Sequence, residues 1–139
     1  MQLDSSNTMR YCRHILLPEV QEEGQETLMN SHALIVGAGG LGCAVLQYLV
    51  AAGIGKITVF DHDTVDITNL QRQILYPELS VGYSKVETAK QQLAKLNSQV
   101  EINTFNKQFD HSDKSTLNSV NVVIDCSDNL KTRILLNPL

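Results

Sequence analysis

Basic runs are missing from this sequence of 139 residues, in which 15 acidic side chains outnumber 11 basic ones and the formal net charge is −4. General binding to nucleic acid needs a cationic face, so the charge balance argues against that class of partner. The sequence also lacks the apolar segment of a signal peptide and any apolar run of the roughly 20 residues that cross a membrane. We expect a cytoplasmic protein that acts without a nucleic acid or a membrane.

Cysteine and histidine are sparse and poorly placed for disulfide or metal chemistry. The three cysteines, Cys12, Cys43 and Cys126, are an odd number without a C-x-x-C pair, which favours neither a disulfide framework nor a zinc site. We interpret Cys43, in a helical segment, and Cys126, at a strand end, as small buried hydrophobic side chains. The four histidines show no metal-ligand spacing, so we assign them no chemistry.

Glycines, in contrast, form one ordered group. Gly37, Gly39 and Gly42 have G-x-G-x-x-G spacing between a short apolar run, residues 33–36, and an apolar helical segment, residues 41–52. In this motif the first glycine allows a tight turn, the second lets the backbone approach a phosphate, and the third lets the helix pack closely. The free N–H groups at the start of the helix then face the anion.

A carboxylate follows at the distance that the motif requires. Asp61 comes after a second apolar run, residues 57–60, where it can accept a hydrogen bond from a ribose hydroxyl. The glycine loop, which includes Gly40, and Asp61 together predict a mononucleotide or dinucleotide site. The alternative is an ordinary glycine turn in an α/β domain.

The rest of the chain alternates between helical and strand patterns. Helical patterns cover residues 7–16, 24–30, 84–97 and 113–119, and strand patterns cover residues 100–105 and 121–125. With right-handed crossovers, the four strands form a parallel sheet in the order 3-2-1-4. We therefore predict a single α/β domain with a Rossmann-like core at residues 32–139 and an N-terminal helical arm at residues 1–31.

A lysine that could bind a phosphate group is predicted at the carboxyl edge of the sheet. Ser84 and Glu87 have the spacing of a capping box, which places Lys85 in the first turn of a helix. A positive charge there opposes the helix dipole. A bound polyphosphate would favour this lysine, and the alternative is an exposed lysine bent into solvent.

Acidic residues follow the last predicted strand at the same edge. A carboxylate beside a triphosphate is repulsive unless a cation lies between them, so Asp128 or Asp125 is predicted as a magnesium ligand. The other interpretation is that Ser127 or Asp128 caps a helix that begins near Asn129.

The connection over residues 62–83 is long and has no clear periodicity, which is typical of functional loops. Its apolar residues favour an ordered loop over a disordered one. Asn69, Arg72 and Gln73 lie within it at near-helical spacing. We expect them on one short turn above the strand ends.

Five stretches of the sequence together resemble the family of ThiF, MoeB and HesA, the bacterial relatives of the enzymes that activate ubiquitin. The stretches are RYCRHILLPEVQEEGQETL (10–28), VGAGGLGC (36–43), FDHDTVDITNLQRQ (60–73), VGYSKVE (81–87) and DCSDNLKTR (125–133). Their number and order make this resemblance far more specific than the glycine motif alone.

The resemblance implies an ATP site. By similarity, the glycine loop with Asp61 would hold the adenosine, and Asp128 would bind Mg²⁺. Four residues match the polar and phosphate-contacting positions of the family: Asn69, Arg72, Gln73 and Lys85. Spacing alone favours a solvated basic face around Arg13. The resemblance instead implies that Arg13 reaches the ATP phosphates from the neighbouring subunit of a homodimer.

The resemblance also implies a reaction. Members of the family adenylate the C-terminal glycine carboxylate of a small ubiquitin-like sulfur carrier similar to ThiS or MoaD, which yields an acyl-adenylate and pyrophosphate. Such carriers serve thiamine or molybdopterin biosynthesis. Two other functions stay open: a non-catalytic fragment that binds ATP or dimerises, and an NAD-binding oxidoreductase domain.

Relatives of this kind continue well beyond the position of Leu139. We therefore expect the chain to carry the nucleotide-binding half of such an enzyme and little of the half that binds the carrier. Its fourth strand is then expected to form an exposed edge of the sheet.

Overall fold

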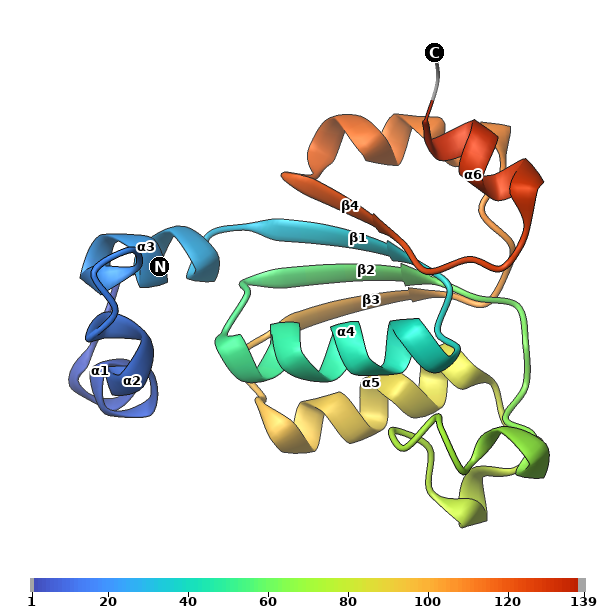
Figure 1. The fold of residues 1–139 in the computed structure, drawn as a ribbon, viewed down its shortest axis with the longest axis horizontal. Helices are drawn as coiled ribbons and strands as arrows, with labels where there is room; N and C mark the ends of the chain where they lie inside the picture. Colours follow the sequence, from blue (N-terminus) through green and yellow to red (C-terminus); the bar gives the residue numbers. More distant parts are fainter. Residues whose placement is uncertain (1, 138–139) are drawn as a thin grey trace.

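Four parallel strands form the sheet in the computed structural model, which describes residues 2–137 (Figure 1). The strands are β1 (His32–Val36), β2 (Lys56–Phe60), β3 (Glu101–Phe105) and β4 (Val122–Asp125). Their order is β3-β2-β1-β4, so the predicted order 3-2-1-4 is confirmed. Both central strands are buried along nearly their whole length, as expected for parallel strands with helices on both faces.

Helices cover both faces of the sheet (Figure 1). α4 (Gly40–Ala52) and α5 (Lys85–Leu96) pack on one face, and α6 (Leu130–Leu136) and the 3₁₀ helix η3 (His111–Ser119) cover the other. Each face has its own apolar cluster, the larger one lying under α4 and α5. The architecture is therefore the predicted Rossmann-like α/β fold. Among the described residues, none of the helices is long and apolar enough to cross a bilayer.

β4 is an edge of the sheet, as the sequence predicts. It pairs with β1 on one side, and Val122 and Val123 on this strand are 43% and 36% exposed. Its carboxyl end nevertheless meets the glycine loop, because the N–H of Cys126 donates to the carbonyl of Val36 at 2.8 Å. This bond fixes the segment after β4 beside the segment after β1.

The N-terminal arm contains three helices at the amino ends of the strands: α1 (Ser5–Arg10), α2 (Cys12–Ile15) and α3 (Gln21–Met29) (Figure 1). The prediction of one helix over residues 7–16 is wrong, because the chain leaves the helical conformation at Tyr11. The phenol of Tyr11 is buried and accepts a hydrogen bond from Nδ2 of Asn97 at 2.9 Å. Its ring lies so close to Gly53 that a Cβ there would approach it to 2.4 Å. The break therefore docks the arm onto the core.

The start of α5 follows the prediction only in part. Oγ of Ser84 accepts from the N–H of Glu87 at 3.5 Å, but the Glu87 carboxylate accepts from Oγ1 of Thr104 on β3 instead of closing a capping box. The buried side of the helix ends before its last residue, since Leu93 is buried and Leu96 is 47% exposed. Two helices begin earlier than predicted: α3 begins before residues 24–30, and η3 begins before residue 113. The strands, α4 and α5 differ from their predicted bounds by one residue.

Candidate functional site

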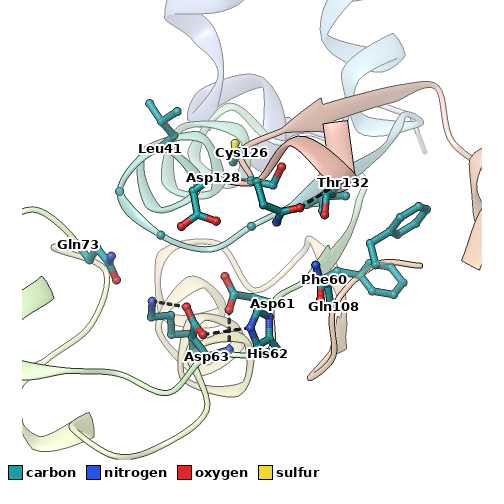
Figure 2. Close-up of a pocket in the computed structure, with 18 of the residues that line it drawn as sticks. Leu41, Phe60, Asp61, His62, Asp63, Gln73, Gln108, Cys126, Asp128 and Thr132 are labelled. Atoms are coloured by element: carbon teal, nitrogen blue, oxygen red, sulfur yellow. Dashed lines mark hydrogen bonds and ion pairs between the residues drawn. The ribbon is translucent and has the colours of Figure 1, made fainter. Parts of the chain in front are cut away.

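An open cavity of about 510 Å³ lies at the carboxyl ends of the strands, where α/β sheets bind their ligands (Figure 2). Five segments line it: the glycine loop, the residues after β2, the crossover that ends at Lys85, the residues after β3, and the residues after β4. Nine of the eleven residues predicted for the site lie in its wall, namely Gly37, Gly39, Gly40, Asp61, Asn69, Arg72, Gln73, Lys85 and Asp128. The other two, Gly42 and Arg13, lie elsewhere.

The glycine loop takes a shape that side chains would prevent. Gly37 has φ +102°, and a Cβ on it would lie 2.6 Å from the carbonyl oxygen of Cys126. A Cβ on Gly42 would lie only 2.0 Å from the carbonyl oxygen of Gly37, so Gly42 lets α4 start directly under the loop. Within residues 2–137, the backbone N–H groups of Gly39, Gly40 and Leu41 have no acceptor. They are the free donors expected at a helix N-terminus, and they suit an anion.

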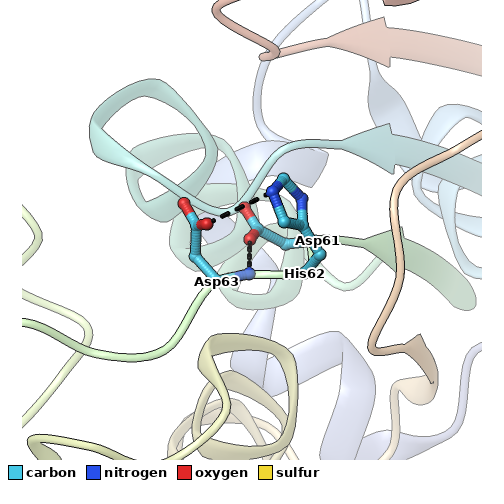
Figure 3. A group of neighbouring side chains, drawn as sticks. All are labelled: Asp61, His62 and Asp63. Carbon is cyan, nitrogen blue, oxygen red and sulfur yellow. Dashed lines mark hydrogen bonds and ion pairs between the residues drawn. The ribbon is translucent and has the colours of Figure 1, made fainter.

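Asp61 ties the glycine loop to the end of β2. Its Oδ2 accepts from the N–H of Ala38 at 2.7 Å. Its Oδ1 accepts from the N–H of Asp63, also at 2.7 Å (Figure 3). A carboxylate offers about four acceptor positions, so Asp61 can still accept from a ligand hydroxyl. Its predicted contact with ribose stays a prediction, and its bond to Ala38 is a second role that the sequence did not indicate.

Lys85 is part of the cavity wall. The lysine is 4% exposed, and its Nζ lies 3.4 Å from Oδ2 of Asp63, whose side chain is 54% exposed. The alternative of a lysine bent into solvent is therefore wrong. A long ion pair with an exposed partner is weak, which leaves the ammonium group available to a ligand. Asp63 was missed by the sequence analysis, although it stands two residues after Asp61 at the same strand end.

His62 is also in the wall, between the two aspartates. One ligand atom from each of Asp61, His62 and Asp63 lies within 4.8 Å of the others (Figure 3). The Nε2 of His62 is 3.4 Å from Oδ1 of Asp63. The sequence analysis assigned the histidines no chemistry, and it did not predict that His62 would line the cavity. The positive charge of the Lys85 ammonium, close to Asp63, disfavours the binding of a metal cation by these three residues.

The crossover after β2 brings three of the predicted side chains to the cavity. Asn69 ends the 3₁₀ helix η1 (Ile67–Asn69), and the exposed Arg72 follows it. Gln73 is 3% exposed, and within the described residues its Oε1 has no hydrogen-bond partner. Buried polar atoms are nearly always paired, so this atom in a cavity wall indicates a place for a polar ligand.

The two candidate magnesium ligands differ in their surroundings. Oδ1 of Asp125 accepts from the backbone N–H and the Oγ of Ser127, at 2.9 and 2.6 Å, and Oδ2 of Asp125 lies 3.9 Å from Nε of Arg133. Asp128 is exposed, lines the cavity and has no partner within residues 2–137 (Figure 2). A carboxylate without a partner is the donor type that Mg²⁺ prefers. Asp128 is therefore the better candidate.

The helix after Asp128 is capped by a different residue from the one expected. Oδ1 of Asn129 accepts from the N–H of Thr132 at 2.9 Å and starts α6. The interpretation that Ser127 or Asp128 caps this helix is wrong. The side chain of Asp128 is thereby left outside the structural hydrogen bonds.

Neither cysteine near the cavity is activated. Burial raises the pKa of the Cys43 thiol, and burial with a smaller contribution from Asp125 raises the pKa of Cys126. Both thiols stay protonated at neutral pH, whereas a nucleophilic cysteine needs a lowered pKa. Cys43 is buried, as the sequence analysis expects, whereas for Cys126 that expectation is wrong, because it is only partly buried and lines the cavity.

Comparison with known proteins identifies the family to which these features belong. The ThiF family matches residues 11–139. The chain belongs to the ThiF family. Among curated relatives, the adenylyltransferase and sulfurtransferase MOCS3 of Aedes aegypti is 47% identical over 137 residues, which are 98% of this chain and 31% of that protein. The molybdopterin-synthase adenylyltransferase of Escherichia coli K12 is 42% identical over 98% of this chain and 55% of its own length.

Solved structures related to this ThiF-family chain include complexes with ATP. The E. coli tRNA N6-threonylcarbamoyladenosine dehydratase TcdA in complex with ATP has a TM-score of 0.84 at 25% identity, over 94% of this chain and 54% of its own. E. coli MccB with ATP has a TM-score of 0.80 at 30% identity, over 96% and 42% of the two chains. This ThiF-family chain thus spans about a third to a half of the length of the relatives described.

Proposed function

We propose that this chain forms the ATP site of an adenylyltransferase that activates the C-terminal glycine carboxylate of a ubiquitin-like sulfur carrier of the ThiS or MoaD type. The observation that carries the proposal is the single cavity wall shared by free backbone donors, a buried lysine and an unpaired aspartate. Relatives named as adenylyltransferases and related structures with ATP support it. We assign the reaction to the cytoplasm, where free thiols like the three in this chain stay reduced.

The reaction needs positioning and charge neutralisation more than a nucleophile from the protein. A carboxylate oxygen of the carrier attacks the α-phosphorus of ATP, the bond from that phosphorus to the bridging oxygen breaks, and pyrophosphate leaves with the electron pair. Lys85 and Arg72 would stabilise the charge that develops on the phosphate oxygens. The N–H groups of Gly39 and Gly40 would hold the phosphates in place.

Magnesium fits the donor set on one side of the cavity. We assign Asp128 as its ligand, because this carboxylate has no structural partner and faces the cavity beside the glycine loop (Figure 2). The ion, when bound, would neutralise charge on the leaving pyrophosphate. Asp125 would serve to hold the turn around Ser127 in shape.

The first test is binding of ATP measured by titration calorimetry, with and without Mg²⁺. We expect Mg²⁺ to tighten binding, and Asp128→Asn to abolish that gain at a cost of about tenfold in affinity, because a charge-assisted contact is lost. Glu19→Gln, an exposed acidic residue on the arm, is the matched control. Equal magnesium dependence in Asp128→Asn and the wild type would remove Asp128 from the site.

A second measurement separates the proposed activity from other functions. An adenylyltransferase exchanges labelled pyrophosphate into ATP when its carrier is present, whereas a protein that only binds ATP does not. Titration with NADH gives the contrast to an oxidoreductase domain. Tight NADH binding together with absent ATP binding would refute the proposed function.

Arg13 is exposed and lies outside the cavity wall of its own chain, on the arm at the opposite end of the strands (Figure 1). We propose that it acts in the cavity of a second copy in a homodimer. A homodimer of the Arg13→Ala variant would have no site that binds ATP tightly, and neither would a homodimer of the Lys85→Ala variant. Because half of the randomly mixed dimers pair the two variants and have one intact site, an equal mixture should recover about a quarter of the wild-type sites. No recovery on mixing, with dimers present, would contradict this role.

A further inference from the structure

The peptide groups on either side of Ala38, in the centre of the glycine loop, are both anchored. The N–H of Ala38 donates to Oδ2 of Asp61 at 2.7 Å. The carbonyl oxygen of Ala38 accepts from the phenol O–H of Tyr76 at 2.5 Å and from the thiol of Cys43 at 3.6 Å. Ala38 itself has no exposed surface. Two of the anchors, Asp61 and Tyr76, come from distant parts of the chain, so tertiary contacts help to fix the loop.

Tyr76 is well suited to act as a permanent donor. It comes from the crossover, 38 residues after Ala38, and is 4% exposed. Its own N–H donates to the carbonyl of Gln73 at 3.1 Å, within the turn that carries the cavity side chains. Burial raises the pKa of the Tyr76 phenol far above its usual value, with a smaller contribution from Cys43. The phenol therefore keeps its proton at neutral pH and can donate it to the carbonyl of Ala38.

The anchored carbonyl determines where the next N–H points. In a planar trans peptide, the C=O of one residue and the N–H of the next point in opposite directions. Because the carbonyl of Ala38 points toward Tyr76, the N–H of Gly39 points away from it, and Gly39 lines the cavity. That N–H has no acceptor among the residues the structure describes. It is a donor held ready for a ligand.

The loop would not hold this orientation without an anchor. Ala38 stands between Gly37 and Gly39, and glycine allows backbone conformations that other residues do not. A rotation of the peptide between Ala38 and Gly39 would turn the N–H of Gly39 into the core and present a carbonyl oxygen to the ligand. A carbonyl oxygen repels a phosphate, so the orientation decides whether the loop binds an anion.

We propose that Tyr76 is a positioning residue, which with help from Cys43 fixes the Ala38 carbonyl and so aims the N–H of Gly39 at a phosphate group of the nucleotide. The inference rests on the proposed ATP site and adds a residue outside the cavity wall to it. Tyr76 acts only through the loop and has no contact with the ligand. The thiol of Cys43 is a weaker donor and contributes less.

The test compares ATP with adenosine, which lacks the phosphates, in Tyr76→Phe and in the control Tyr83→Phe. Tyr83 lies on the same crossover, is 67% exposed and is outside the cavity wall. In Tyr76→Phe we expect ATP affinity to fall about tenfold and adenosine affinity to change less than about twofold, because only the phosphate contact is lost. Tyr83→Phe should leave both affinities as in the wild type. In NMR spectra, the Gly39 amide signal should shift on addition of ATP, and shift less in Tyr76→Phe.

The outcomes separate this proposal from the proposed function. Equal losses for ATP and adenosine, or no loss at all, would show that Tyr76 supports the fold only, with the ATP site itself intact. A wild type that binds no ATP would overturn both proposals. If Tyr76→Phe does not fold, the test is instead a comparison of ATP affinity between Cys43→Ala and Cys43→Ser. The alanine variant should bind ATP about two- to threefold more weakly than the serine variant, because serine keeps a donor for the Ala38 carbonyl and alanine does not. Adenosine affinity should be the same in both variants. Equal ATP affinity of these two variants would overturn the proposal.

Discussion

Replacement of Lys85 by methionine should weaken ATP binding by about 30- to 100-fold, because loss of a buried charged partner costs about 2–3 kcal/mol. Methionine keeps most of the apolar stem that fills this 4% exposed position. The fold should tolerate the change, since the partner that remains, Asp63, has a side chain 54% exposed and is solvated by water. Calorimetric titration with ATP measures the affinity, and thermal unfolding checks the stability.

Lys90 provides the control for this experiment. It lies on the same helix, α5, and it is exposed and outside the cavity wall. Lys90→Met removes the same charge from the chain, so it reports any general effect of net charge on binding. An equal loss of ATP affinity in Lys90→Met and Lys85→Met would show that Lys85 has no specific contact with the nucleotide.

Replacement of Gly42 by alanine should lower the free energy of unfolding by about 3 kcal/mol or more, a large effect for one added methyl group. The new Cβ would lie 2.0 Å from the carbonyl oxygen of Gly37, and backbone atoms cannot move aside as a side chain would. Either α4 must shift or the glycine loop must open. Urea denaturation measures the loss as a lower transition midpoint.

Gly40→Ala is the matched variant in the same loop. The nearest atoms to a Cβ at Gly40 belong to the flexible side chain of Arg72, at 3.9 Å. Gly40 also begins α4, where alanine has the better helix propensity. We expect its stability to stay within about 1 kcal/mol of the wild type. If both alanine variants unfolded at the same urea concentration, close packing under the loop would not explain the need for Gly42.

The parts of the fold that could be predicted depend on local sequence. The strand, glycine turn and helix at residues 32–52 follow from one apolar run and three glycines, and the strand order follows from the handedness of the crossovers. The carboxyl ends of parallel strands meet at one edge. For that reason Lys85 and Asp128 could be expected in one cavity although they are far apart in the chain.

The parts that could not be predicted depend on contacts between distant residues. The helix break at Tyr11 follows from a hydrogen bond to Asn97, 86 residues away. The Glu87 side chain closes no capping box because Thr104, on a neighbouring strand, offers it a hydroxyl. Tyr76 had no recognisable motif in the sequence, since its role depends on a carbonyl group that any residue at position 38 would supply.

Because the arm is docked on the core of its own chain, the number of complete ATP sites should depend on the protein concentration. Tyr11 and Asn97 hold the arm on the core, and Gln25 adds a hydrogen bond from Nε2 to the carbonyl of Ala52 at 2.9 Å. Arg13 is therefore carried at a fixed place, away from the cavity of its own chain. In the proposed dimer, each complete site needs two chains. Below the dissociation constant of the dimer, the number of complete sites then falls with the square of the protein concentration, so ATP capacity per chain is highest in concentrated solution.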